Sequence, residues 1–450
     1  MLTKRQNMLE TIRGGKPDRF VNQFEALEFI YGNPVSSGGR PPAPPATDDA
    51  PIKLRLGYNL IKLADPSQGG DLTDRLLALR RELGMELGVI IPAMQLKDDV
   101  SLGSNEFAIS IDGTEVSRGT VGDGALEDGA AKDNAAAAIV DSLRTLMRLR
   151  ADDFPKSAAP PMMAMREGRM VNQWGVTIQF SPDLPGPFPV HDEEHIVLKD
   201  ITKWREQVKF PNLKYPREDW EAAAEPIKNI DRNEVFVTAM MAPGIFDHLH
   251  YLMGMENALL SFYEEPEALK ELLAALTAWE MEYISYICEY FKPDVVFHHD
   301  DWGSHRSTFM SPDMFEEFIL PAYKQIYGYF KANGVELIIH HSDSYAATLV
   351  PHMIEAGIDV FQGCVDTNDV PALIKQYGGK ISFMGNINNG TVDVPDWTDA
   401  LIAETVEKSC RECGKLYYIP CCTAGGPGSS YPGVFDAVTR EINRMSEEMF

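Results

Sequence analysis

The sequence predicts an α/β fold: an eight-stranded TIM (β/α)8 barrel that carries a small inserted α+β domain near its N-terminus. The chain has 450 residues, which is more than one ordinary domain core needs. Short apolar segments alternate with helical stretches along its C-terminal two-thirds, a pattern typical of parallel strands joined by helices. A stretch rich in Pro, Gly and Ser interrupts this pattern early in the chain. Together, these features predict two structural units.

The first elements belong to the barrel. Apolar residues at helical spacing open the chain, and an extended apolar segment follows from about Val21 to Ile30. The break at residues 34–51, with its VSSGGRPPAPPATDDA run, can hold neither a helix nor a central strand. A second soft segment, KSAAPP, lies at residues 156–161. We therefore expect residues 1–46 and 159–450 to form the barrel and residues 47–158 to form an inserted module.

The inserted module has its own patterns. An amphipathic helix is predicted over Leu72–Leu83, and NEFAISIDGTEVSRGTV is predicted to form two strands joined by a turn at Asp112 and Gly113. The segment from about residue 52 to 120, beginning LRLGYNLIKLADPSQGGDLTDRL, resembles the start of the cytoplasmic domain of the flagellar and type III secretion export-gate family. It lacks that family's membrane helices, so the resemblance does not imply export. We expect a module that docks on the barrel or makes the chain a homo-oligomer.

The barrel strands are predicted from apolar segments that end in polar or small residues. The segment near Val21 supplies one strand. The others are predicted at Met170–Ile178, Val235–Met241, Val295–His299, Val335–His341, Val360–Gly363, Ile381–Asn386 and Leu416–Cys421. In barrels of this type, chemistry is located where the strands end, at the C-terminal face. The strand ends here are rich in His, Asp and Cys, so we expect the active site among them.

The composition excludes two classes of partner. A formal net charge of −26, from 41 Lys and Arg against 67 Asp and Glu, would repel a phosphate backbone, so we expect no nucleic-acid partner. No apolar run approaches the roughly 18 to 20 residues that span a bilayer, so we expect no membrane partner. The N-terminal segment lacks the apolar core of a signal peptide, which predicts a cytoplasmic protein. The six cysteines are too few for a disulfide framework.

A metal site is one interpretation of the strand ends. His341, Asp343, Cys421 and Cys422 offer imidazole, carboxylate and thiolate ligands from two strand ends, a set that suits Zn²⁺ acting as a Lewis acid. The alternative is that the cysteines are small core residues and that the histidine satisfies a buried hydrogen bond. Spacing alone leaves both interpretations open.

Two longer runs carry a family resemblance. The segments IIHHSDSYAATLVPHMIEAGIDVF and VVFHHDDWGSHRSTFMSPDMFEEF resemble motifs of the uroporphyrinogen-decarboxylase superfamily. In that superfamily a strand ends in His-x-Cys-Gly. The register here places the histidine at His341, while Asp343 stands where the family has cysteine. A later family cysteine falls on Cys421 or Cys422. The resemblance thus implies the same metal ligands, with one departure from the usual thiolate.

The resemblance covers about residues 1–34 and 162–450 and narrows the function. The Arg-Gln-Ala-Gly-Arg motif of the decarboxylases proper is absent, whereas the chain looks like the corrinoid-dependent, O-demethylase-like branch. That branch implies a zinc-dependent methyltransferase that moves a methyl group between a small methylated substrate, here a methoxylated aromatic, and a corrinoid (cobalamin). No Asp-x-His-x-x-Gly signature is present, so the corrinoid is expected on a separate corrinoid-binding protein. A metal-free decarboxylase-like lyase and a non-catalytic barrel scaffold are the alternatives.

Catalytic roles follow from side-chain chemistry. Asp300 and Asp301 are adjacent, so we expect one of them to orient a ligand or protonate a departing phenolate and the other to cap the next helix. His299 and His305 are predicted to donate to the same oxygen; His305 occupies the place of a family glutamine. A further set is predicted to bind substrate, with core packing as the alternative for its apolar members. This set is Trp174, Met240, Met241, Trp302, Tyr345 and Asn386.

Overall fold

The computed structural model describes most of the chain. The described residues are 1–23, 34–35, 52–64, 70–73, 75–76, 79, 83, 94–99, 101–111, 114–121, 129–150, 168–180, 188–423, 430–431 and 433–450. The chain divides into two compact units. Unit 1 contains residues 1–42, 171–178 and 189–450, and unit 2 contains residues 43–170 and 179–188. The sequence predicts a barrel of residues 1–46 and 159–450 and an insert of residues 47–158. That each of these parts folds independently remains a prediction.

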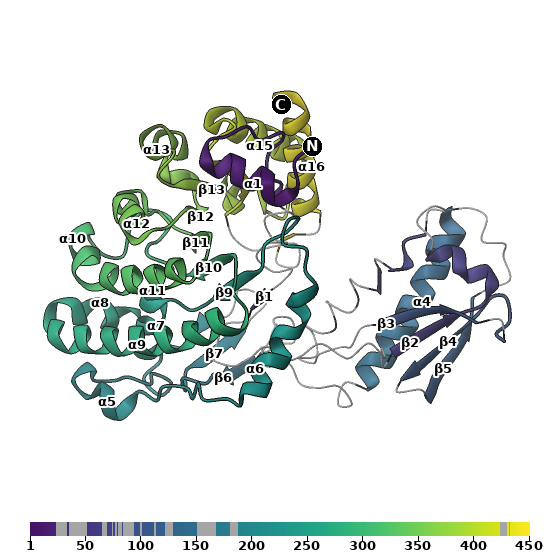
Figure 1. Ribbon diagram of the computed structural model, residues 1–450, viewed down its shortest axis with the longest axis horizontal. Helices are drawn as coiled ribbons and strands as arrows, with labels where there is room; N and C mark the ends of the chain where they lie inside the picture. The colour runs from purple at the N-terminus through teal and green to yellow at the C-terminus, as the bar shows by residue number, and fades with distance from the viewer. Residues whose placement is uncertain are drawn as a thin grey trace. The chain divides into compact units, whose positions relative to one another are not determined.

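Unit 1 is built on a parallel sheet whose strands follow one another in chain order (Figure 1). The sheet consists of β1 (Pro34–Val35), β9 (Thr238–Met241), β10 (Val295–His299), β11 (Leu337–His341), β12 (Val360–Cys364), β13 (Ser382–Ile387) and β14 (Tyr418–Cys422). Every neighbouring pair is parallel. The six strands predicted from residue 235 onward are therefore confirmed, with bounds that differ by up to three residues.

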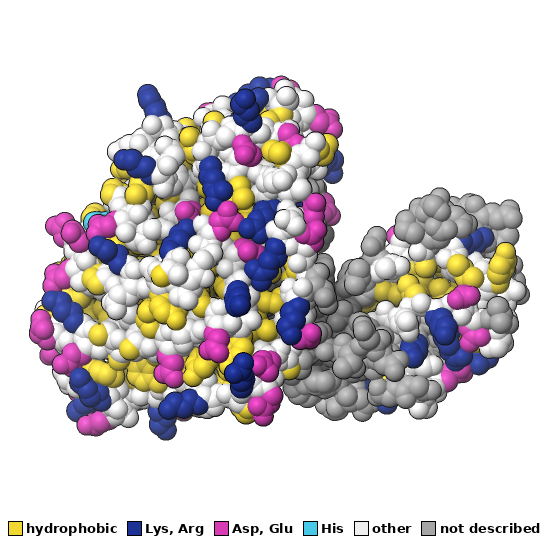
Figure 2. Space-filling model, in the orientation of Figure 1, with side chains coloured by type: hydrophobic (Ala, Val, Ile, Leu, Met, Phe, Trp, Pro, Cys, Tyr) yellow, Lys and Arg dark blue, Asp and Glu magenta, His cyan; other side chains and the backbone are white. Residues whose placement is uncertain are grey.

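Helices connect these strands and flank the sheet (Figure 1). They are α1 (Lys4–Arg13), α5 (Trp204–Gln207), α6 (Arg217–Ala224), α7 (Ile245–Met253), α8 (Met255–Glu264), α9 (Pro266–Tyr290), α10 (Pro312–Met314), α11 (Leu320–Ala332), α12 (Val350–Ala356), α13 (Val370–Tyr377), α14 (Asn389–Val392), α15 (Asp399–Cys413) and α16 (Val434–Met449). Figure 2 shows acidic and basic side chains interspersed over the drawn face of unit 1. Arg444 of α16, for example, pairs with Glu407 of α15 and with Glu441.

Successive side chains along the strands point to opposite faces of the sheet and form a buried layer on each face. In β10, Val295 and Phe297 join an inner core that also contains Leu337 and Ile339 of β11. His298 instead lies beside Glu280 of helix α9, on the helix side of the sheet. Because side chains alternate along a strand, His299 at the end of β10 shares the inner face with Phe297.

One predicted barrel strand, Met170–Ile178, is wrong. These residues contribute to β6 (Gly168–Val171) and β7 (Thr177–Phe180), which form a separate three-stranded sheet with β8 (Phe188–Pro189). Asn172 divides the segment because its side-chain oxygen accepts hydrogen bonds from the backbone of Trp174 and Val176, and Gly175 has a φ of 80°.

The eighth predicted strand, near Val21, falls mostly on residues 24–30, which lie outside the described part of the chain. The described strands form an open parallel sheet with β1 at one edge and β14 at the other. The α/β class with a parallel sheet is confirmed by this arrangement, and a closed ring of eight strands is not seen among the described residues.

Unit 2 contains a four-stranded sheet in the order β3 (Met94–Asp98), β2 (Ile52–Leu56), β4 (Glu106–Ile111), β5 (Thr114–Thr120). The predicted antiparallel pair is confirmed as β4 and β5, while its turn lies outside the described residues. The described helical residues of the predicted Leu72–Leu83 helix pack with α4 (Gly129–Leu149) and the sheet in one core. No helix among the described residues is long and apolar enough to cross a membrane.

Candidate functional site

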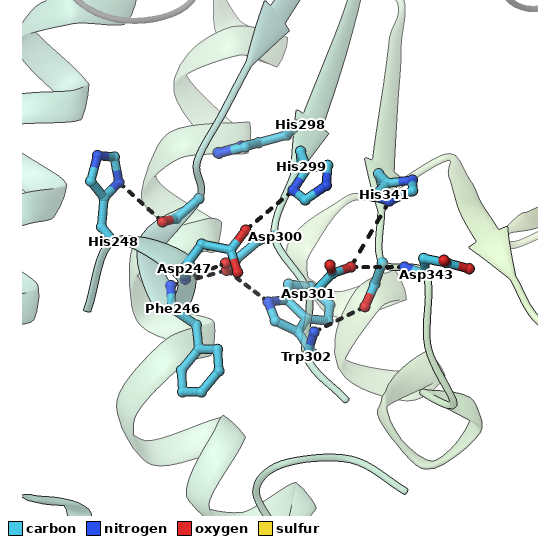
Figure 3. Close-up of polar contacts among 12 residues, drawn as sticks. Phe246, Asp247, His248, His298, His299, Asp300, Asp301, Trp302, His341 and Asp343 are labelled. Atoms are coloured by element: carbon cyan, nitrogen blue, oxygen red, sulfur yellow. Dashed lines mark hydrogen bonds and ion pairs between the residues drawn. The ribbon is translucent and has the colours of Figure 1, made fainter. Parts of the chain in front are cut away.

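Two histidines and an aspartate converge at the carboxyl ends of β10 and β11 (Figure 3). His299 and His341 are direct partners in the strand register, and their rings stack with centroids 4.4 Å apart and planes 25° from parallel. Asp301 follows β10 by two residues, and one of its oxygens lies 3.9 Å from Nε2 of His341. One ligand atom from each of the three residues lies within 4.8 Å of the others. We call His299, Asp301 and His341 the trio.

Both imidazoles of the trio are anchored through Nδ1. Nδ1 of His299 donates to a carboxylate oxygen of Asp247 at 3.2 Å, and Nδ1 of His341 donates to the amide oxygen of Gln362. Nε2 of each ring is therefore available as a ligand. Two imidazole nitrogens and a carboxylate form a donor set that divalent transition metals accept, and metal-binding histidines commonly have their second nitrogen held in this way. The residues present therefore fit a metal ion.

Burial and charge set the protonation states of the site. Burial lowers the pKa of His299, but its hydrogen bond to Asp247 and the charges of Asp247 and Asp301 raise it to about 9. Burial opposes the charged form of Asp247, yet hydrogen bonds from His250 and His299 hold its pKa below the ordinary value. Burial lowers the pKa of His341 to about 3. At neutral pH the metal-free site therefore pairs a cationic His299 with Asp247 and keeps His341 neutral.

Asp300 faces away from the trio and is fully buried. Its carboxylate accepts four hydrogen bonds. The donors are the backbone nitrogens of Phe246 and Asp247 at 3.1 and 2.7 Å, the indole nitrogen of Trp302 at 2.8 Å, and the hydroxyl of Tyr323. Burial and the charge of Asp247 raise the pKa of Asp300 above its ordinary value, although the hydrogen bonds from Tyr323, the Asp247 backbone and Trp302 partly oppose this rise. Asp300 thus accepts from the first turn of helix α7, which precedes it in the chain. The next helix after Asp301, α10, is instead capped by Ser311, so the expectation that one of the two aspartates caps that helix is wrong.

The approach of α7 to Asp300 depends on a glycine. A Cβ atom added to Gly244, the residue before α7, would lie 2.3 Å from the Cβ of Asp300 and 2.5 Å from the hydroxyl of Tyr323. The Gly in the Ala-Pro-Gly sequence therefore lets the helix start directly above the end of β10.

The metal ligands predicted from the sequence are not all gathered in one place. The trio includes His341 but none of the other three. Asp343 contacts the trio through its backbone nitrogen, which donates to Asp301 at 2.8 Å, and its carboxylate points away (Figure 3). Cys421 and Cys422 are buried at the end of β14, where burial raises the pKa of both thiols, to about 12 for Cys422. Metal binding by these cysteines stays a prediction.

The aromatic members of the predicted substrate-binding set lie among core side chains. The ring of Trp302 is fully buried and stacks on His340 at 3.8 Å, on the helix side of the sheet. Trp174 is also buried and packs edge-on against Trp279 of α9 at 4.8 Å. Tyr345 is partly buried, and its backbone nitrogen donates to Ser304. The two tryptophan rings are therefore not brought together at the trio.

The remaining predicted residues divide between the two faces of the sheet. Met240 packs against the inner core, on the same face as Phe297, whereas Met241 is the register partner of His298. The side-chain amide of Asn386 donates to Ser409 and Cys413 of α15. His305 is exposed in the loop after β10. Of this group, only Met240 lies on the face of the sheet that carries the trio.

Sequence analysis did not identify Asp247 and Gln362. Each is a polar residue inside an apolar run, in IFDHLHYLM and in VFQG, and each is buried. A buried acid or amide in such a context needs a specific partner, and this is the signal that could have identified both.

Comparison with known proteins adds family information for each unit. A family model described as uroporphyrinogen decarboxylase (URO-D) matches residues 170–419, more than half of the chain. A second model, described as the FHIPEP family, matches residues 42–144. In this region the chain is 48% identical over 69 residues to the flagellar biosynthesis protein FlhA of Bacillus subtilis and 34% identical over 71 residues to that of Borreliella burgdorferi. These matches cover 15% and 16% of this chain and 10% of each relative.

A solved structure shares the fold. The chain is similar to a structure described as a methyltransferase from Methanosarcina mazei, with a TM-score of 0.53, 12% sequence identity and 99% of both chains covered. At this identity the likeness concerns the fold alone. This likeness and the family model, which matches more than half of the chain, both agree with the parallel α/β architecture. The chain belongs to the uroporphyrinogen decarboxylase (URO-D) family.

Proposed function

We propose that the protein is a zinc-dependent methyltransferase that moves a methyl group between a small methylated substrate, a methoxylated aromatic, and a corrinoid carried by a partner protein. The observation that carries the proposal is the trio, which presents two imidazoles and a carboxylate at the ends of adjacent parallel strands. Family membership and the fold shared with a structure described as a methyltransferase support the reaction class. We further infer that the parallel sheet belongs to a (β/α)8 barrel, in which this edge is the usual place of catalysis.

The proposed zinc ligands are His299, Asp301 and His341, which replace the mixed set containing cysteines expected from the sequence. Three protein ligands leave one position open, as catalytic zinc sites require. A zinc ion held there would act as a Lewis acid toward the oxygen or sulfur that carries the methyl group. Asp301 would be the carboxylate ligand, while Asp300 is fully buried, accepts four hydrogen bonds from the surrounding fold and acts as a positioning residue.

The metal content of the purified full-length protein tests this proposal. Elemental mass spectrometry should find about one zinc per chain in the wild type, as expected for a single site. The metal should be lost in His299→Ala and His341→Ala and retained in a Cys421→Ser/Cys422→Ser double variant. Zinc that is retained in the histidine variants and lost in the double cysteine variant would instead place the metal site at Cys421 and Cys422. A folded wild type that binds no zinc would favour the metal-free lyase.

An activity assay tests the reaction class separately. Methoxylated arenes are supplied with cob(I)alamin, and loss of the cob(I)alamin absorbance is followed with time. The proposal expects this loss to depend on the arene and on His341. A rate that is equal in wild type and His341→Ala would contradict the proposal.

A further inference from the structure

The two imidazoles of the trio donate hydrogen bonds to Asp247 and Gln362, which are not themselves members of the trio. We propose that Asp247 and Gln362 are positioning residues that orient His299 and His341 for a divalent cation. This inference rests on the proposed metal site and extends it to two residues that nothing else assigns to function.

Asp247 is a carboxylate shared by two imidazoles. It lies in α7 and is buried. One of its oxygens accepts from Nδ1 of His299 at 3.2 Å, and the other lies 3.1 Å from Nε2 of His250. Because Asp247 accepts the proton on Nδ1, Nε2 is the nitrogen of His299 that can bind a metal ion, which it does after losing its own proton.

The position of Asp247 is in turn fixed from β10. Its backbone nitrogen donates to Asp300 at 2.7 Å, and Asp300 follows His299 directly in the chain. A closed path therefore runs from His299 along the backbone to Asp300, across to the start of α7, and back through the Asp247 side chain to the His299 ring. Such a path restricts the orientation of the ring, because a rotation of the imidazole would break a buried hydrogen bond.

Gln362 performs the same task for His341 from the neighbouring strand. It is the register partner of His341, and its amide oxygen accepts from Nδ1 of that ring. The opposite edge of the ring, with Nε2, then faces Asp301 at 3.9 Å. The stacking of His299 on His341 gives the two rings nearly parallel planes. Helix α7 thus holds the ring of His299 and strand β12 holds the ring of His341, in each case through Nδ1 of the ring.

A purely structural role for these hydrogen bonds makes a different prediction. If Asp247 and Gln362 only stabilise the fold, their replacement lowers stability but leaves the zinc affinity of the folded protein unchanged. If they position ligands, the affinity falls. Outer hydrogen-bond partners of metal-binding histidines typically change affinity by about 10- to 100-fold.

The test is the dissociation constant for Zn²⁺ of the full-length protein, measured by competition with a chromophoric chelator. We expect Asp247→Ala and Gln362→Ala, which remove the acceptor for Nδ1, each to weaken binding by about 10- to 100-fold. Asp247→Asn and Gln362→Glu, which keep a side-chain oxygen as acceptor, should each bind zinc more tightly than the corresponding alanine variant. The matched control is Asp294→Asn: Asp294 directly precedes β10 and accepts from the backbone of Val237 at the opposite end of the strand, so zinc affinity should not change.

The outcomes separate the two levels of the proposal. A wild type that binds no zinc overturns the metal site and this inference together. A wild type that binds zinc, with Asp247→Ala and Gln362→Ala both weakened by less than about 10-fold, overturns the positioning role alone. Circular dichroism monitors folding, and if Asp247→Ala does not fold, Gln362→Ala decides the question. The visible spectrum of bound Co²⁺ gives a second readout, because a displaced imidazole changes the coordination geometry.

Discussion

Asp300 and Asp301 are adjacent carboxylates with opposite roles, and replacing each by alanine separates those roles. Asp300→Ala removes the acceptor for four buried donors while leaving the trio intact in composition. Asp301→Ala removes a ligand of the trio; among the described residues it also removes one hydrogen bond, from the backbone of Asp343, and the 3.9 Å contact with His341. We expect the first variant to lose stability and the second to lose metal.

The magnitudes follow from what each change leaves unpaired. A buried donor without a partner costs about 1–3 kcal/mol, so four would cost about 4–12 kcal/mol if nothing relaxed. Entry of water and rearrangement of Tyr323 reduce this sum, and removal of one partner from a buried charged network typically costs about 3–5 kcal/mol. The side chain of Asp301 is 36% exposed, so its removal should cost less than about 1 kcal/mol.

The assay is urea unfolding followed by tryptophan fluorescence. All six tryptophans lie in unit 1, so the signal reports this unit alone. With an m-value of about 4 kcal/mol/M for a unit of this size, a loss of about 4 kcal/mol lowers the midpoint by about 1 M urea. Metal-free protein is used for both variants, so that lost metal binding does not contribute. Equal midpoints for Asp300→Ala and Asp301→Ala would refute the assignment of Asp300 to the first turn of α7.

Three further outcomes are expected. Burial and the charge of Asp300 raise the pKa of Glu280 to about 8, so the folded state holds a proton that the unfolded state releases above pH 4.5. Glu280 should therefore lower the stability of the wild type by at most about 5 kcal/mol as pH rises from about 4.5 to 8, and Glu280→Gln should remove this contribution in urea titrations at several pH values; an unchanged slope contradicts the assignment. Ile109→Ala, in the core of unit 2, should cost about 2–5 kcal/mol and speed hydrogen exchange in β4 without moving the tryptophan midpoint. Deletion of residues 47–158 should leave that midpoint in place if the module is a true insertion, and an unfolded product would argue against it.

The parallel strands were predictable because their local signals agree with the fold. The run Val-Val-Phe-His-His alternates between two buried faces and ends in polar residues, which identifies β10 and its orientation. The Met170–Ile178 segment has a similar apolar content but contains Asn172 and Gly175, whose local hydrogen bonds and positive φ make a turn. Asn-x-x-Gly inside an apolar run was the overlooked evidence for that turn.

The sequence indicated the three residues of the trio but not that they lie together. His299, Asp301 and His341 were all singled out from the sequence, the first two as catalytic residues and the third as a metal ligand. Their grouping depends on the register of β10 with β11, which pairs residues 42 positions apart, and no local pattern specifies it. Asp247 was missed for a similar reason: its partner His299 lies 52 positions away, and the contact exists only because α7 starts on Asp300.

The most direct test of the metal site is a crystal structure of the full-length protein with anomalous diffraction measured at the zinc absorption edge. We expect one strong anomalous peak about 2.0–2.2 Å from Nε2 of His299, Nε2 of His341 and a carboxylate oxygen of Asp301. A peak within bonding distance of Cys421 or Cys422 instead, or no peak in crystals grown with zinc, would contradict the account.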